Sequence, residues 1–496
     1  MFSAGAASSG ASAYLQEDTR VSGEVEQRIA NASLTAELDR WGLQSPWSTE
    51  SAALNAGIEY RKDQLSLEPD QHFRDADVVG LGTPLLPLNG ATSVKEVFGE
   101  VRIPVLSAKV VDFLVLEGGY RQSWYRNDRN RFSTSSRKVG VDLSIVRGVR
   151  LRATDQKAVR APNVQELFAL PFSENFANDP CAGFSPSATL PQCQSSGVTA
   201  TEYGHVARQP DEDQGYNGFG GGNSELAPET ATTRSVGIVL EPRFLRGFNL
   251  TIDWFDIRLK GAVGVIGSQT LIDTCVATGD PTFCARVHRD SEGSLWLSQD
   301  GFVDDRNANI GALRTNGIDV GASYRRALGK LGSADFDFQG TYTRRFTVDN
   351  GGLATPYDCA DLYGQICGFP IPRWRHNLRA TWTAHAGLSI SALWRHLSAV
   401  PVDADLFNER SPEGIYNIAV ARIPQQNYID LTFGATLRGK DRLTVGVRNL
   451  FDREPPQVAT GRFGACGSVF CNGNTFPQLY DPAGRFMFVG ATFNLR

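Results

Sequence analysis

Apolar and polar residues alternate strictly near the C-terminal end of the sequence. Every second residue in 429–437 is apolar, and the residues between them are polar or small. A period of two with one apolar face predicts a β-strand that is wet on one side. The same alternation returns at 443–447 after a polar turn, and again at 487–495 after a long loop. This segment therefore predicts an antiparallel hairpin and one further strand, whose open edge needs a partner.

The alternation recurs through the whole chain and predicts an all-β protein of about fifteen strands with no convincing helix. The other expected strands are 18–38, 54–61, 97–103, 110–125, 131–146, 149–153, 236–240, 250–254, 318–324, 336–342, 378–382 and 388–394.

From residue 139 onward, short and long connections alternate along the chain. The short turns are 147–148, 242–247, 327–332, 386–387 and 439–441, and the long loops are 158–229, 261–309, 346–373, 397–426 and 451–484. Successive connections of an up-and-down antiparallel sheet lie on opposite edges, so all long loops should lie at one end. This parity is typical of an outer-membrane barrel with short periplasmic turns and long extracellular loops, and soluble sandwiches and propellers have no reason for it.

Four aromatic residues lie near the ends of expected strands. They are Trp374, Trp382, Trp394 and Tyr428. Aromatic rings of this kind suit the two membrane interfaces of a barrel. Simple packing is the alternative for each of them.

The composition of the chain restricts the class of protein and its possible partners. The chain has 496 residues, of which 41% are hydrophobic and 21% charged, with fifty glycines and a net charge of −5. This is the composition of a folded protein, and its mildly acidic balance argues against a nucleic-acid partner. No apolar run is long enough to predict a transmembrane helix. The first residues, MFSAGAASSGASAYLQ, lack the basic and apolar regions of a signal peptide.

All eight cysteines lie in four of the five long loops, two in each. The pairs are Cys181 with Cys193, Cys275 with Cys284, Cys359 with Cys367 and Cys466 with Cys471. Even, local pairing predicts disulfides formed in an oxidising compartment, each worth roughly 2–3 kcal/mol. Zinc binding is the alternative, but the spacings contain no CxxC and no nearby histidines. The bridges either order the loops or protect them from proteases, and the sequence leaves both open.

Enzyme signatures are missing from the sequence. There is no GxSxG, HExxH or GxxxxGK[ST] motif, and the six histidines are scattered. The glycine cluster at 218–222 has no strand before it and no helix after it, so it does not predict a phosphate loop. Asp300, Asp304 and Asp305 could hold a cation, but a solvated acidic loop is the expected arrangement. We predict no catalytic, cofactor-binding or metal-binding residue.

Five motifs in order resemble the barrel part of TonB-dependent outer-membrane receptors, over most of the chain from about Val97. They are VRAPNVQELF (159–168), GNSELAPETATTRSVGI (222–238), IGALRTNGIDVGASY (310–324), VRNLFDREPP (447–456) and YDPAGRFMFVGATF (480–493). Considered as residues, these motifs predict the places where strands end and turns begin. Pro162 and Pro228 break strands at loop edges, Asn449 and Asp452 can bond backbone groups at a strand end, and Gly484 admits a turn.

The resemblance implies an antiparallel up-and-down transmembrane barrel of about 22 strands around an N-terminal plug. Residues 1–496 are then expected to be one receptor-like barrel domain, truncated at its N-terminus. We expect it to lack the signal peptide, the TonB-engaging segment, the plug and about seven strands. The chain also ends in Phe493 to Arg496, without the terminal aromatic residue usual in the family.

The function implied by the resemblance is TonB-dependent uptake of a scarce nutrient, such as an iron–siderophore complex or an oligosaccharide, in the outer membrane of a Gram-negative bacterium. The expected partners are outer-membrane lipid, a small nutrient ligand and, for the full-length parent, the TonB complex; no cofactor is expected. Inward polar residues would surround the ligand, for example Thr251, Asp253, Asp335, Asp337, Gln339, Asp430 and Thr432. The alternatives are a passive porin-like channel, a non-functional fragment or, third, a barrel enzyme, against which the lack of a Ser/His/Asp constellation argues.

Overall fold

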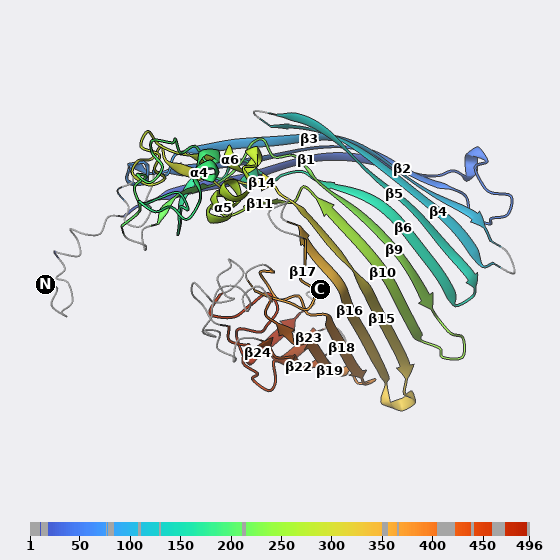
Figure 1. Ribbon diagram of the computed structural model, residues 1–496. Coiled ribbons are helices and arrows are strands. Elements are labelled where there is room, and N and C mark those ends of the chain that lie inside the picture. Colours follow the sequence, from blue (N-terminus) through green and yellow to red (C-terminus); the bar gives the residue numbers. More distant parts are fainter. Residues whose placement is uncertain are drawn as a thin grey trace.

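The alternating segments form one large antiparallel sheet that curves into an open arch in a computed structural model (Figure 1). The structure describes residues 10, 18–75, 77, 84–107, 111–127, 130–210, 215–349, 356–364, 367–403, 422–437, 441–458 and 472–493. Fifteen strands follow one another in chain order in a sixteen-stranded sheet, and β17 (Tyr357–Asp358) pairs with β16 off this path. The prediction of about fifteen strands is therefore confirmed.

Most of the fifteen strands are longer than the segments that the sequence pattern indicates. They are β1 (Val21–Glu37), β2 (Ala53–Pro69), β3 (Leu88–Leu106), β4 (Phe113–Asn127), β5 (Arg131–Val146), β6 (Val149–Arg160), β9 (Glu229–Leu240), β10 (Phe248–Lys260), β15 (Ala312–Ala327), β16 (Ser333–Asp349), β18 (Trp374–Thr383), β19 (Leu388–Leu397), β22 (Gln426–Leu437), β23 (Asp441–Arg448) and β24 (Phe486–Thr492). The expected last strand ends at Thr492, and residues 494–496 lie outside the described part of the chain.

The two sides of the sheet differ in chemistry. One side, the apolar face, carries the exposed large hydrophobic residues, including Val139 at 64% and Val489 at 72% exposure. The other side, the polar face, carries the intervening residues and lines the recesses described below. Register fixes these faces across strands, since Ile390 opposes Phe433 and Phe433 opposes Val445. If one strand slipped by one residue against its neighbour, its apolar side chains would move to the polar face. The alternation of apolar and polar residues therefore specifies the register.

The connections follow the predicted parity. Short turns join β5 to β6, β9 to β10, β15 to β16, β18 to β19 and β22 to β23, while long loops follow β6, β10, β16, β19 and β23. In an antiparallel path in chain order, all five long loops lie at the same end of the strands, which we call the long-loop end.

The strand-end residues take the roles expected of them. β6 ends at Arg160, just before Pro162, and β9 begins directly after Pro228. Asn449 has a positive φ of 50° and its side chain both accepts from and donates to the backbone of Arg453, at 2.8 Å each. Further on, the Arg485 N–H donates to Asp452 Oδ1 at 2.7 Å, beside Gly484 with a φ of 67°. The side chains of Asn449 and Asp452 thus form hydrogen bonds with backbone groups at the two ends of the last long loop.

Long loops contain the helices, and here one prediction is wrong. The sequence predicted no convincing helix, yet α5 spans Ser268–Thr278 and buries Leu271, Ile272, Cys275 and Val276. Its apolar residues are spaced for one face of a helix, but the run is too short to stand out in a chain of strands. Packing against neighbouring loop segments stabilises it, and Gly279 ends it in the left-handed conformation.

Smaller elements occupy the loops and the turns. They are η1 (Asp39–Trp41), α2 (Gln71–Arg74), α3 (Val164–Phe168), β7 (Phe172–Phe176), α4 (Leu190–Ser195), β8 (Tyr216–Gly220), β11 (Val263–Gly264), α6 (Pro281–Cys284), β12 (Val287–His288), β13 (Phe302–Asp304), β14 (Ala308–Asn309), η2 (Gly329–Leu331), β20 (Val400–Pro401) and β21 (Arg422–Ile423). No helix in the described ranges is long and apolar enough to cross a membrane.

Of the two alternatives left open for the four aromatic residues, simple packing holds for Tyr428. Trp374, Trp382 and Trp394 share the register of the apolar face. Tyr428 opposes Arg395 on the polar face, where it is only 1% exposed. Its position one residue before the apolar Ile429 decides the face, because alternate residues of a strand point to opposite sides.

Strands β1 and β24 form the two edges of the arch (Figure 1). Within the described residues, β1 pairs with β2 and β24 pairs with β23, each along one side. Closure of the sheet into a barrel, and the absence of a plug, stay predictions.

Candidate ligand-binding surfaces

The described residues of 161–228 and 261–311 fold together into a unit that we call the loop domain. It contains the four-stranded sheet β12-β13-β8-β7 together with α4, α5 and α6, and Figure 1 shows these elements gathered at one end of the arch. Leu271, Ile272, Leu295 and Val303 are fully buried in its hydrophobic core. Two long loops thus share one core, as a small domain does, and this fixes their position relative to each other.

Local sequence explains how the short helices of this domain begin. Thr189 starts α4 with a capping box that includes the side chain of Gln192. Asp280 starts α6, where its carboxylate accepts from the Thr282 N–H at 2.8 Å. Such caps satisfy the free N–H groups of the first helical turn.

Disulfides join the same segments. Three are present, Cys181–Cys193, Cys275–Cys284 and Cys359–Cys367, and these are the local pairings expected from the sequence. The first two lie in the loop domain, and the third lies in the loop between β16 and β18. Cys466 and Cys471 lie outside the described residues, so their bond stays a prediction.

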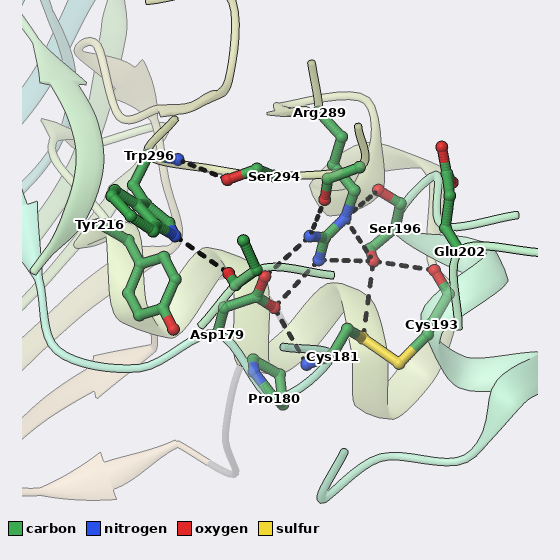
Figure 2. A network of polar contacts seen from close by, with 12 residues as sticks. Asp179, Pro180, Cys181, Cys193, Ser196, Glu202, Tyr216, Arg289, Ser294 and Trp296 are labelled. Carbon is green, nitrogen blue, oxygen red and sulfur yellow. Dashed lines mark hydrogen bonds and ion pairs between the residues drawn. A yellow bond between two sulfur atoms is a disulfide. The ribbon is translucent and has the colours of Figure 1, made fainter. Parts of the chain in front are cut away.

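A buried ion pair connects the two halves of the loop domain (Figure 2). Arg289 Nη1 lies 2.7 Å from Asp179 Oδ2 and Arg289 Nη2 lies 3.0 Å from Asp179 Oδ1. The two side chains are 3% and 0% exposed. Arg289 also donates to the Gly293 carbonyl and to the Ser196 hydroxyl, and the Cys181 N–H donates to Asp179. This bidentate pair has its remaining bonds satisfied, as a buried pair of charges requires.

A second buried carboxylate, Asp305, lies in the same domain and is 1% exposed. It accepts from the N–H groups of Ile266 at 3.0 Å and Gly267 at 2.9 Å. Burial, together with the neighbouring Glu174 carboxylate, raises the pKa of Asp305 to about 6 although the two N–H groups oppose this. Glu174 itself accepts from the Ser268 hydroxyl at 2.7 Å. The two loops therefore meet at a pair of carboxyl groups that repel when both are ionised.

This pair predicts a pH dependence. A carboxyl whose pKa is raised by folding stabilises the fold below its unfolded pKa, and this stabilisation is lost as the pH rises through about 6. The Glu174→Gln variant keeps an acceptor for Ser268 but removes the repulsion. We therefore expect it to be as stable as the wild type near pH 4, and more stable by on the order of 1 kcal/mol above pH 6. Thermal unfolding of both proteins against pH tests this, and a difference independent of pH contradicts it.

The polar face of the sheet forms a recess of about 550 Å³ near the long-loop end. Side chains from β10, β15, β16, β18 and β19 contribute to its lining, with Gln478 and Leu479 from the last long loop. A second recess lies beside it over β18, β19, β22, β23 and β24, and the two share Arg395, Gln478 and Leu479. Both have the concave form expected of a small-molecule site, with polar groups at defined positions.

Arg395 connects the two recesses. Its guanidinium bonds Asp430 on β22 through two contacts of 3.0 and 3.1 Å, and Asp481 in the last long loop at 3.3 Å. It also lies over the ring of Tyr428, 4.8 Å from the centroid. The Asn449 N–H donates to the same Asp430 carboxylate at 2.9 Å. The last long loop is thereby held against the polar face by charged hydrogen bonds.

Three other arginines of these recesses have no carboxylate partner of the kind that Arg395 has in Asp430 and Asp481, among the described residues. Arg375 lies in the first recess, and Arg379 and Arg448 lie in the second. None of the three forms an ion pair with a residue in the described part of the chain. Arg379 donates to the Ser391 hydroxyl at 3.2 Å, and Arg448 lies 5.9 Å from the ring centroid of Phe488. The recesses therefore present guanidinium groups that remain available to an anion.

All seven residues expected to face inward share the register of the polar face. Thr251 and Gln339 line the first recess, and Asp430 and Thr432 line the second. The structure does not place the remaining three in the lining of either recess. Asp253 is held by Arg152 at 2.6 and 2.8 Å, Asp335 is ion-paired with Arg325, and Asp337 follows Asp335 toward the long-loop end.

Four arginines of the recesses were not among the residues predicted from the sequence. Arg375, Arg379, Arg395 and Arg448 all have the polar parity of their strands, so the alternation could have identified them. The acidic residues in the loop take structural roles instead: Asp304 pairs with Arg306 at 2.6 Å and Asp305 bonds backbone N–H groups. No group of three or more potential metal ligands occurs among the described residues.

A family model described as TonB dependent receptor-like, beta-barrel, matches residues 2–450. The chain belongs to this TonB-dependent receptor β-barrel family. Members of the family are outer-membrane receptors and transporters of Gram-negative bacteria, with TonB and small ligands as their general partners. No curated protein matches the sequence.

Solved structures of TonB-dependent receptors have the same fold. A mutant of the ferric enterobactin receptor PfeA from Pseudomonas aeruginosa, in complex with enterobactin, aligns with a TM-score of 0.59 at 16% identity, over 94% of this chain and 54% of that one. The siderophore receptor PirA from Acinetobacter baumannii aligns with a TM-score of 0.55 at 14% identity, over 95% and 54%. The chain thus spans about half the length of these receptors, and at such identities the likeness shows the fold alone.

Proposed function

We propose that the protein takes part in TonB-dependent uptake of an anionic iron chelate across the outer membrane. The observation that carries this proposal is that Arg375, Arg379 and Arg448, in the two recesses of the polar face, form no ion pair with a described residue. Arginine binds the oxygens of carboxylates and similar anions through two parallel hydrogen bonds. A neutral oligosaccharide, the other nutrient considered, would not need three such charges.

The comparisons support the ligand class without deciding it. The two receptors named above bind or are named for siderophores, and their fold is that of this chain. The loop domain and the last long loop lie at the same end of the strands as the recesses, so a ligand that enters there meets both. Coupling to TonB, and the outer membrane as the site of action, belong to the same proposal.

A binding experiment tests the ligand class. We expect the Arg375→Gln/Arg379→Gln variant to lose about tenfold or more in affinity for an anionic ferric siderophore, since each charged hydrogen bond is worth roughly 1.5–3 kcal/mol. Fluorescence titration with a panel of anionic, neutral and cationic ferric siderophores measures this. Arg442→Gln is the matched control, because Arg442 lies on the same face but beside the short turn between β22 and β23.

The passive channel is the second candidate. In whole cells, uptake that continues unchanged after the proton gradient is collapsed would favour a porin-like channel. Equal affinity of the double variant and the wild type for every siderophore in the panel would contradict the proposed ligand class.

A further inference from the structure

Two rows of basic residues cross the apolar face toward the long-loop end. In each row, the register of neighbouring strands places residues directly opposite one another. The first row is Arg28, Lys62, Ser93, Arg126 and Arg131 on β1 to β5. The second row is Arg137, Lys157, Thr232, Arg258 and Arg314 on β5, β6, β9, β10 and β15. Each row has two cations, a hydroxyl and two cations, and neither contains an acidic residue.

The rows lie where the apolar face ends. On the apolar face, the neighbour of each cation lies two residues away along its strand. Toward the short turns, this neighbour is Val139 for Arg137. It is Tyr60 for Lys62 and Trp124 for Arg126. Aromatic rings at this position mark the boundary between hydrocarbon and headgroups in a membrane β-protein. The cations of the first row lie just beyond these rings, toward the long-loop end.

Like charges directly opposite each other destabilise a sheet, yet such pairs occur four times in these rows. Arg126, Arg131, Arg137 and Lys157 form no ion pair with any residue that the structure describes. Neighbouring strands are about 4.8 Å apart, so the two cations of a pair can contact one phosphate group together. An anion bound between them would relieve the repulsion.

The fourth pair shows a preorganised arrangement. Asp256, only 5% exposed, lies 3.0 Å from Arg258 Nε and 2.6 Å from Arg314 Nη2. One carboxylate thus fixes two guanidinium groups, which keep a net positive charge and are 50% and 38% exposed. The Arg314 Nε donor has no hydrogen-bond partner among the described residues. An unused donor and surplus charge suit a phosphate ligand.

We propose that the two rows bind the phosphate groups of anionic lipid headgroups in the leaflet at the long-loop end. This goes beyond the proposed uptake function, because the rows lie on the opposite face of the sheet from the recesses. Basic residues at a membrane surface attract anionic lipids, and an exposed row on a rigid sheet loses little entropy on binding.

Lipid selectivity tests the proposal. In the whole protein reconstituted in phosphatidylcholine bilayers, we expect spin-labelled phosphatidylglycerol to bind about fivefold more tightly than spin-labelled phosphatidylcholine at low salt. The preference should fall toward one as NaCl rises to about 0.5 M, because salt screens exposed charges. Replacing Arg137, Lys157, Arg258 and Arg314 together by Gln should remove most of it.

The control removes the same charge from the opposite end of the strands. Arg243, Arg246, Arg326 and Lys330 lie in or next to the short turns, and their fourfold Gln variant should keep the wild-type preference. Should the first variant fail to fold because Asp256 loses its partners, Lys62→Gln/Arg126→Gln/Arg131→Gln in the other row gives the same test. Equal losses in the row and control variants, or no preference in the wild type, would overturn the proposal.

Discussion

The Arg289→Met variant is expected to lose about 3–5 kcal/mol of loop-domain stability, because it leaves the Asp179 carboxylate buried without a counter-charge. Asp179 is 0% exposed at its side chain, so water cannot replace the guanidinium. The same substitution removes the bond to Ser196, which joins the two long loops, and the bond to Gly293 within the second of them. Limited proteolysis in increasing urea, read at sites within 161–228 and 261–311, measures the loss.

A surface pair in the same domain provides the control. Arg306 is 49% exposed and pairs with Asp304 at 2.6 Å. Arg306→Met should cost at most about 1 kcal/mol, because exposed ion pairs contribute little. The double variant Asp179→Asn/Arg289→Met removes both charges and should recover part of the loss. Equal destabilisation by Arg289→Met and Arg306→Met would show that the buried pair does not hold the loops together.

The second large effect concerns the two faces of the sheet. Phe433→Arg places a charge on the apolar face, where Phe433 is 48% exposed, and is expected to cost about 2–4 kcal/mol near the bilayer midplane. Leu431→Arg should behave in the same way. Thr432→Arg, one residue away on the polar face, should be far better tolerated because that side chain lies in a recess.

Refolding into detergent or lipid vesicles, followed by heat-modifiable migration on gels, compares the three variants with the wild type. The neighbouring positions share the same strand and nearly the same depth, so Thr432→Arg is itself the matched control. Equal folding yields on the two faces would contradict the assignment of the apolar face to lipid.

The alternation of residues in the sequence was sufficient to predict the sheet. Side chains on a strand point alternately to its two sides, so one apolar face leaves a period of two that can be read without the structure. Together with the parity of short and long connections, it predicted the number of strands, their order and the common end of the long loops. It also placed Thr251 and Gln339 on the polar face. For Tyr428 the aromatic character left interface and packing open, and its parity, on the polar face, decides for packing.

The structure of the long loops could not be predicted, because it depends on long-range contacts that leave no periodic pattern in the sequence. Asp179 and Arg289 are 110 residues apart, and Arg395 and Asp481 are 86 residues apart, so nothing local marks them as partners. The α5 helix is short and is stabilised mainly by the core that both long loops build. The basic rows likewise emerge only when the register aligns ten separate positions. Local periodicity therefore determined the sheet, and long-range pairing decided the loop domain, the recesses and the charged rows.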